Sequence, residues 1–147
     1  QQQCSHHRFA VHHQAANCNS QQQHRGLYAG RAQGIFAGQV IVDKEAVGTQ
    51  AHQLSRSLLL SPQAQAYSEP QLQIDTDDVQ CGHGATVSQL DENALFYLQS
   101  RGIERYRAHC MLTEAFAQDA LHNLQPAWLH GWLQQRVNRL LSAVASA

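Results

Sequence analysis

The chain has 147 residues, of which 43% are hydrophobic and 14% are charged, and its formal net charge is -1. This length is enough for one domain with a core, or for a core with a small appendage. Lysine and arginine form no cluster or stripe, so the charge pattern argues against a nucleic acid partner. No apolar run approaches the roughly 20 residues of a membrane span, so no membrane partner is expected.

The cysteines are few and widely spaced. Cys4, Cys18, Cys81 and Cys110 form no CxxC pair, and the chain is not one of the short, cysteine-dense secreted proteins that depend on disulfides. The first residues carry no secretion signal pattern. We therefore expect reduced thiols in a cytoplasmic protein. Because the chain begins with Gln1, we also expect a fragment or a processed product.

Residues 1–26 are rich in Gln, His, Asn and Ser and poor in apolar residues. Phe9 and Val11 stand two apart, which fits a strand in a sheet whose other strands lie elsewhere. Histidine-rich tracts can bind metal, but on a strand the adjacent His12 and His13 face opposite sides and cannot easily share one ion. We favour exposed polar positions for the whole group, which comprises His6, His7, His12, His13 and His24.

Residues 27–90 have the pattern of β structure. Val40–Val42 is β-branched throughout, and Leu72 and Ile74 alternate with polar residues as in a half-buried strand. The gaps between such runs are irregular, about 13–18 residues, and indicate no clean repeat. The pattern leaves two architectures open, an antiparallel sandwich and a coiled stack of strands.

Glycine and proline punctuate this region. Gly30, Gly34 and Gly38 are evenly spaced but do not match a GxGxxG loop, so turn or bulge positions are predicted. Ser61-Pro62 and Glu69-Pro70 are interpreted as breaks between strands.

Residues 91–147 are predicted to be helical. Asp91 is a natural N-cap for a first helix, which Gly102 ends. A second helix is expected from about Ile103 to Leu124, and Pro126 fits the first turn of a third. The apolar stripes of these helices are interpreted as core, and they include Met111, Leu112, Ala115, Phe116, Leu121, Trp128 and Trp132.

The segment at 77–86 is the most distinctive candidate site. Cys81 and His83 are residue types that bind iron and zinc, and on a strand they point to the same face. Gly82 and Gly84 would leave the backbone open to a partner. Because one Cys and one His cannot complete a four-ligand site, any metal here needs ligands from elsewhere. An inert thiol beside a hydrogen-bonded histidine is the alternative.

No pattern for catalysis stands out. The sequence contains no GxSxG elbow and no P-loop. We therefore expect no ATP hydrolysis by that route and a protein that is not an enzyme by itself.

Five stretches, in order along the chain, resemble one known family. Gly34–Val42 is similar to the family pattern G-V-F-x-G-x-I-x-V, and 53–60 is similar to its polar strand ending in three leucines. The segments 70–74, 77–86 and 95–103 follow. Together they resemble the C-terminal region of the SufB/SufD family of iron–sulfur cluster assembly proteins.

The SufD branch gives the better resemblance. The SufB branch has a Glu after the His of the Cys-x-His segment, where this chain has Gly84. The SufB branch also has a reactive Cys in the strand with the leucine run, where this chain has Ser55, Arg56 and Ser57. The resemblance implies a mainly β fold with an α C-terminus, in the form of a right-handed parallel β-helix over 1–90 and a small helical module over 91–147.

The resemblance also implies a scaffold subunit. Such a subunit pairs with a SufB-like subunit through the β-helices, its helical module docks a SufC-like ATPase, and a homodimer can mimic the SufB–SufD pair. His83, with Cys81 beside it, would contribute at the SufB interface to a transient iron–sulfur cluster, and this chain alone would bind no cofactor stably. Phe96, Tyr97 and Arg101 would lie near the SufC contact.

Two other hypotheses stay open at this stage. The first is a stand-alone metal-binding protein or metal-dependent enzyme that uses the histidine-rich N-terminal residues with Cys81 and His83, although no carboxylate has a convincing ligand spacing with those histidines. It predicts a metal ion that is lost when His6, His12 and His83 are substituted. The second is a β-helix packing module without chemistry.

Overall fold

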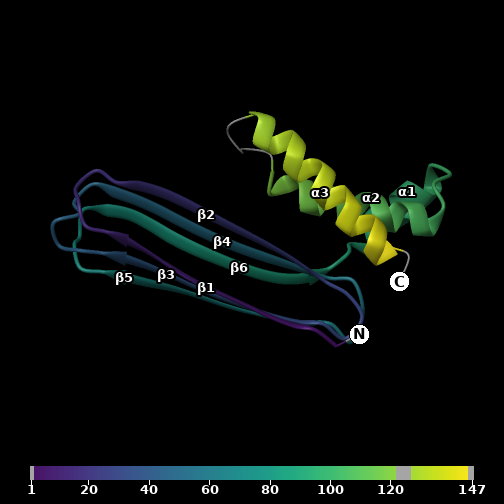
Figure 1. The fold of residues 1–147 in the computed structure, drawn as a ribbon, viewed down its shortest axis with the longest axis horizontal. Helices are drawn as coiled ribbons and strands as arrows, with labels where there is room; N and C mark the ends of the chain where they lie inside the picture. The colour runs from purple at the N-terminus through teal and green to yellow at the C-terminus, as the bar shows by residue number, and fades with distance from the viewer. Residues whose placement is uncertain (1, 122–126, 146–147) are drawn as a thin grey trace. The chain divides into compact units, whose positions relative to one another are not determined.

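The computed structural model describes residues 2–121 and 127–145. It divides into two compact units, Gln1–Ser88 and Gln89–Ala147. Strands build the first unit and helices build the second (Figure 1).

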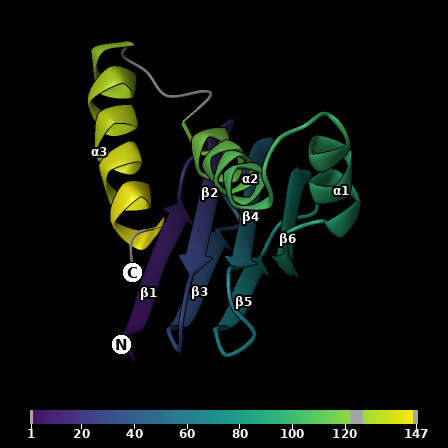
Figure 2. The same cartoon turned by 90° about the vertical axis from the view of Figure 1, so that its right-hand side faces the viewer.

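Six strands are present in the described part of the first unit. They are β1 (Cys4–His13), β2 (Asn19–Tyr28), β3 (Gln33–Val42), β4 (Thr49–Leu59), β5 (Gln65–Ile74) and β6 (Val79–Gln89). One sheet has the order β1-β3-β5 and the other the order β2-β4-β6, so successive strands alternate between the sheets (Figure 2). The pairs β1–β3, β3–β5 and β2–β4 are parallel, which excludes the antiparallel sandwich and confirms a mainly β body with an α C-terminus.

The repeat of this unit spans two strands. Paired residues of neighbouring strands are 29 apart in the sequence for β1 and β3, 31 apart for β2 and β4, and 32 apart for β3 and β5. The unequal spacings agree with the expectation of no clean repeat in the sequence, although every second strand joins the same sheet.

The core lies between the two sheets and follows the alternation of the strands. Every second residue of β3, from Gly34 to Val42, is buried. Val40, Val42, Ala46 and Ala51 form a buried apolar cluster, and the half-buried residues Leu72, Val79 and Cys81 pack against it.

Two glycines of β3 lie in regular strand and not at turns or bulges, contrary to the prediction. A methyl group on Gly34 would overlap the ring of Tyr28, and one on Gly38 would overlap the side-chain amide of Gln53. Both positions therefore need glycine, because side chains that cross the space between the sheets leave no room for a methyl group there. The turn prediction holds for Gly30, whose φ is 63°.

Pro70 does not break a strand, although the sequence was interpreted so. It lies inside β5, where it pairs with Gly38. Since β5 is at the end of the order β1-β3-β5, the missing N–H of the proline can face away from the ladder.

The second unit contains three helices in the described chain, α1 (Glu92–Ser100), α2 (Arg105–Asp119) and α3 (Ala127–Ala145). The predicted N-cap is confirmed, since the side chain of Asp91 accepts a hydrogen bond of 2.9 Å from the backbone N–H of Asn93. The predicted stop is also confirmed, because Gly102 has a φ of 81° directly after the C-cap Arg101.

The second helix is shorter than predicted. It begins after Glu104, whose carboxylate accepts hydrogen bonds from the backbone N–H groups of Tyr106 and Arg107 at 2.9 and 3.1 Å. It ends at Asp119, and the N–H of Leu121 then bonds the carbonyl of Gln118 in a turn. The predicted end at Leu124 and the predicted first-turn residue Pro126 lie outside the described residues.

The apolar stripes of α2 and α3 are less buried than predicted. Ala108 and Thr113 are the buried residues of α2, whereas Met111 is 42% exposed. On α3, Trp128 is 72% exposed and Trp132 is 56% exposed. The interpretation of these side chains as core is therefore wrong for the described chain.

None of the described helices is long and apolar enough to span a membrane.

Candidate functional site

The Cys-x-His segment lies in β6, next to β4 in the second sheet. A methyl group on Gly82 would lie 3.6 Å from Nδ1 of His52, and one on Gly84 would lie 3.2 Å from Cδ1 of Leu54. Those two glycines therefore face the outer side of the sheet. By the alternation of a strand, Cys81 and His83 face the inner side.

The two candidate residues differ in exposure. Cys81 is half-buried and packs against the apolar cluster between the sheets, while His83 is exposed. No group of three or more His, Cys, Asp and Glu side chains in the described residues could hold a metal ion. The ligands of any ion or cluster at His83 would therefore have to come in part from outside this group of described residues.

The glycines leave a shallow groove on the outer face of the second sheet. Its volume is about 350 Å³. Backbone in the groove is accessible at β6 because Gly82 and Gly84 carry no side chain. The groove is lined by Gln21, Gln22, Gln23, His52, Gln53, Leu54, Gly82, His83 and Gly84.

A pair of buried amides lies inside the same part of the fold, and the sequence analysis did not single it out. Gln53 is 2% exposed, and its Nε2 donates a hydrogen bond of 2.8 Å to Oε1 of Gln22. Its own Oε1 is buried and accepts no hydrogen bond from a described residue. A sequence pattern could have indicated this pair, because polar residues recur at every second position on the inner face of β4, at Gln53, Ser55 and Ser57.

The N-terminal histidines are not all exposed polar residues, as the sequence suggested. His12 and His13 face opposite sides as predicted, since Nε2 of His12 bonds Oδ1 of Asp43 at 2.7 Å, while His13 is buried and bonds Ser20 at 2.8 Å. His24 is half-buried as well. Burial of two of these residues is possible because each finds a hydrogen-bond partner between the sheets.

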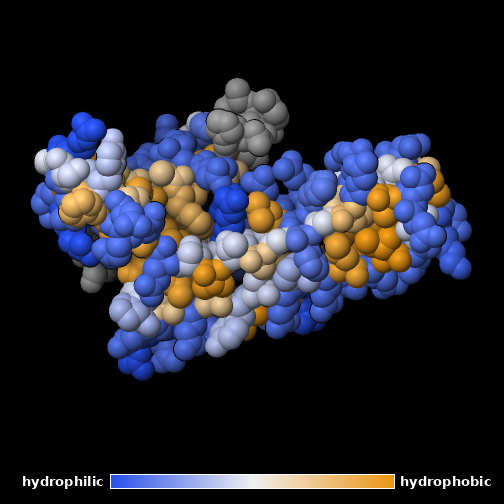
Figure 3. Space-filling model, turned by 180° about the vertical axis from the view of Figure 1, so that it is seen from behind, coloured by the Kyte–Doolittle hydropathy of each residue, from blue (hydrophilic) through white to orange (hydrophobic). Residues whose placement is uncertain are grey.

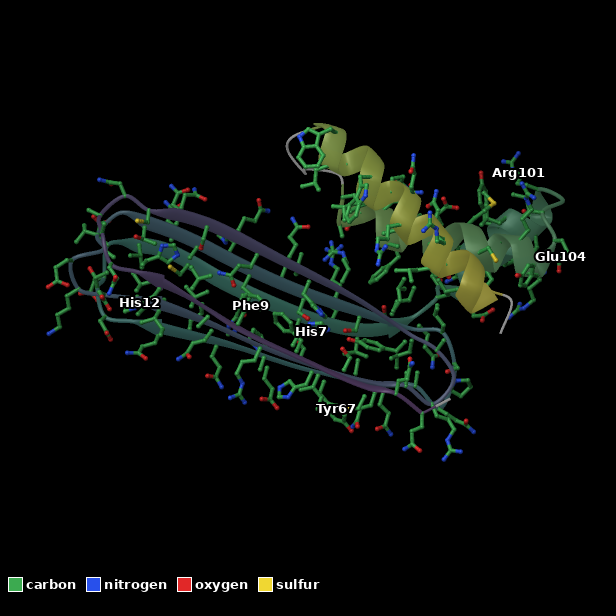
Figure 4. The ribbon with its side chains drawn as sticks, in the orientation of Figure 1. His7, Phe9, His12, Tyr67, Arg101 and Glu104 are labelled. Carbon is green, nitrogen blue, oxygen red and sulfur yellow. The ribbon has the colours of Figure 1, made fainter. Side chains whose placement is uncertain are left out.

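His24 belongs to a cluster of rings near β1. Its ring centroid is 4.4 Å from that of Phe36 and 5.9 Å from that of His7. His7 and Phe9 of β1 are labelled in Figure 4, and the Phe9 ring is 5.3 Å from that of Phe36. Burial lowers the pKa of His24, and the nearby charges of His7 and Arg25 lower it further.

The metal-binding hypothesis required three histidines to act together. His6 and His12 lie on β1 in one sheet, whereas His83 lies on β6 in the other. His12 is paired with Asp43. The described fold does not bring the three imidazoles into one ligand set.

The helical residues predicted to contact a partner lie on and just after α1. Phe96 is 73% exposed and Tyr97 is 57% exposed. The guanidinium of Arg101, labelled in Figure 4, lies 5.2 Å from the centre of the Tyr97 ring. These side chains form an exposed surface with aromatic and cationic character, a composition typical of protein interfaces.

Cys110 of α2 is half-buried. It forms a hydrogen bond with Tyr106, and this bond is the main reason why the pKa of Tyr106 is raised. None of the four cysteines forms a disulfide in the described chain.

Comparison with known proteins identifies relatives over most of the chain. Residues 1–116 match the family described as "SUF system FeS cluster assembly, SufBD core domain". A SufBD family protein of Synechocystis is 41% identical over 134 residues, which are 91% of this chain and 29% of that protein. The iron–sulfur cluster assembly protein SufD of Escherichia coli is 34% identical over 131 residues, which are 89% of this chain and 31% of that protein.

A plant relative is also similar. Protein ABCI7, chloroplastic, of Arabidopsis thaliana is 39% identical over 123 residues, which are 83% of this chain and 26% of that protein. The chain thus spans less than a third of the length of each of these three relatives.

Proposed function

The chain belongs to the SufB/SufD family, and on that premise we propose that it acts as a SufD-like scaffold subunit in iron–sulfur cluster assembly. The subunit pairs with a SufB-like subunit, docks a SufC-like ATPase and performs no catalysis alone. The cluster is the cargo that the complex builds, and no stably bound cofactor of this chain is involved. The four cysteines, none of which is in a disulfide, support a cytoplasmic location.

The observation that carries the proposal is the position of His83. It is an exposed imidazole on β6, the last strand in the order β2-β4-β6. The outer edge of β6 has no neighbouring strand within the described chain, and such an edge can pair with a strand of another protein. A partner that pairs there would come close to His83.

The chemistry of the imidazole fits this role. Neutral histidine binds iron through one ring nitrogen, as in clusters that have mixed Cys and His ligation. Because the described residues supply no further ligands, the remaining ones would come from the partner. Cys81 is less accessible, since it packs against the apolar cluster, so we assign the contact with the cluster to His83 and a supporting position to Cys81.

A right-handed parallel β-helix is the architecture that supports this pairing best. The strands alternate between two parallel sheets through short connections, and parallel crossovers are almost always right-handed. Viewed from behind, the β unit has an apolar area among hydrophilic residues (Figure 3). A further rung from a longer chain, or a partner, would cover such an area.

We assign the docking of the ATPase to the helical unit. The exposed residues Phe96, Tyr97 and Arg101 supply large apolar and cationic contact area. Residues of these types contribute most of the binding energy in many interfaces.

The test is cluster assembly by the complex of this chain with a SufB-like subunit and a SufC-like ATPase. We expect His83→Ala to lower the amount of cluster formed by at least about 10-fold, since a ligand is lost. The control is His6→Ala, an exposed histidine of β1 that the alternative metal-binding hypothesis requires. Normal assembly by the His83 variant, or equal loss in both variants, would contradict the proposal.

A further inference from the structure

The side chain of Gln53 lies beside that of His83 on the inner face of the second sheet. Gly82 lies beside His52 and Gly84 beside Leu54 on the outer face of that sheet. The residues between them must alternate in the same register, which places His83 next to Gln53.

One atom of Gln53 lacks a partner. Its Oε1 is fully buried and receives no hydrogen bond from any described residue. An unpaired buried carbonyl of this kind destabilises the folded state, because it has lost its hydrogen bonds to water. A native fold rarely keeps such a group without a partner that compensates it.

The hydrogen bond that Nε2 already makes suggests on which side that partner is to be sought. Nε2 of Gln53 is already used toward β2, where it donates to Oε1 of Gln22. Since an amide has its donor and its acceptor on different atoms, a side chain that donates to one neighbouring strand can accept from the strand on its other side. The strand opposite β2 across β4 is β6, and its inner-face residue at this level is His83.

We propose that Gln53 is a positioning residue for His83: when the exposed imidazole turns toward the sheet, Oε1 of Gln53, which has no partner in the described arrangement, accepts a hydrogen bond from one imidazole N–H. This bond fixes the tautomer of the ring and its orientation. The second ring nitrogen then keeps its lone pair directed away from the sheet, ready to bind the cargo. The use of that lone pair rests on the proposed function, whereas the hydrogen bond itself does not.

The tautomer of His83 tests the inference directly in the full chain. The probe is the pair of imidazole ¹⁵N chemical shifts of His83, assigned by comparison with the His83→Ala spectrum. A fixed tautomer gives two widely separated shifts, and an exchanging ring gives shifts that approach each other. We expect the fixed pattern in the unmodified chain and the exchanging pattern in Gln53→Met, which keeps the length of the side chain but removes the acceptor.

Two variants serve as controls. Gln53→Glu keeps an acceptor oxygen beside His83 and can accept from the unused Nε2 of Gln22, so the fixed pattern should return. Gln50→Met makes the same substitution on the same strand at an exposed position, and it should leave the His83 shifts unchanged.

A second measurement covers the case in which Gln53→Met does not fold. The side-chain carbonyl ¹³C shift of Gln53 should move in His83→Ala, because the hydrogen bond that it accepts is lost. Tautomer exchange of the His83 ring in the unmodified chain would overturn the inference. So would a Gln53 carbonyl ¹³C shift that is the same in the unmodified chain and in His83→Ala.

The assembly assay then separates this inference from the proposed function. If both hold, Gln53→Met lowers cluster formation about 10-fold and Gln53→Glu restores it. A fixed tautomer in a chain that supports no cluster assembly would refute the proposed function and leave the positioning role intact.

Discussion

At the scale of single residues, the space between the sheets is filled by side chains that cross it. Tyr28 is 8% exposed, and its ring occupies the place that a methyl group on Gly34 would need. Burial raises the pKa of Tyr28, although a hydrogen bond with Ser57 lowers it in part. The phenol therefore remains neutral near pH 7 and suits a packed interior.

Adding one methyl group at this place should destabilise the β unit. We expect Gly34→Ala to lower the free energy of unfolding by about 1–3 kcal/mol, because the Tyr28 ring must move. The control is Gly131→Ala in α3, where a methyl group meets nothing within 4 Å. That change should stabilise the helix by about 1 kcal/mol. Urea unfolding followed by circular dichroism measures both, and equal stability of the two variants would refute this packing.

The pKa of His24 makes stability depend on pH. Burial lowers this pKa below its ordinary value of 6.5, so the unfolded chain binds more protons than the folded chain just below pH 6.5. The free energy of unfolding should therefore fall as the pH decreases through that window. We expect His24→Gln to reduce this slope in thermal unfolding, whereas His6→Gln at an exposed position should keep it. An unchanged slope in His24→Gln would exclude His24 as the cause.

Part of the candidate site could be predicted from the sequence. The spacing of Cys81 and His83 places both on one face of a strand, whatever the fold. The contribution of Gln53 could not be predicted, because its position beside His83 depends on which strands are neighbours and on their register. Register is a long-range property that hydrophobic alternation within one strand does not specify.

At the scale of helices and strands, the start of α1 rests on a single cap. Asp91 accepts from the N–H of Asn93, and Glu92 adds negative charge in the first turn. We expect Asp91→Ala to cost about 1 kcal/mol of stability in the helical unit, whereas Asp91→Asn should cost much less because it retains an acceptor. The loss of helical circular dichroism on heating measures the difference. Equal effects of the two substitutions would show that the cap is unimportant.

Whether a segment forms a helix or a strand was easier to predict than which other segments pack against it. The cap at Asp91 and the stop at Gly102 are local signals, and both were correct. The buried faces of α2 and α3 were predicted from apolar periodicity, which cannot tell whether a neighbour covers the stripe. For this reason Trp128 and Trp132 were interpreted as core although they are exposed in the described chain.

At the scale of the whole molecule, the exposed aromatic surface of α1 offers a test of docking. We expect Phe96→Ala to weaken capture of a SufC-like ATPase at least 10-fold, because truncation of a central aromatic residue commonly costs about 2 kcal/mol. Tyr67→Ala is the matched control, since Tyr67 is 49% exposed on β5 in the other unit and is labelled in Figure 4. Equal capture by both variants would move the contact away from α1.

The arrangement of the parallel sheets bears on the proposed assembly. A stack of rungs has an edge strand and an open end, and both can be completed by another protein. His83 lies on such an edge strand and lacks further ligands among the described residues. Under the proposed function, an assembly performs the chemistry and this chain has a supporting place in it.

The most direct measurement is size-exclusion chromatography with light scattering of the full chain, mixed with a SufB-like subunit and a SufC-like ATPase. The account predicts one peak that contains all three proteins, and retention of the ATPase in that peak should depend on Phe96. A folded chain that elutes separately from both proteins would contradict the account.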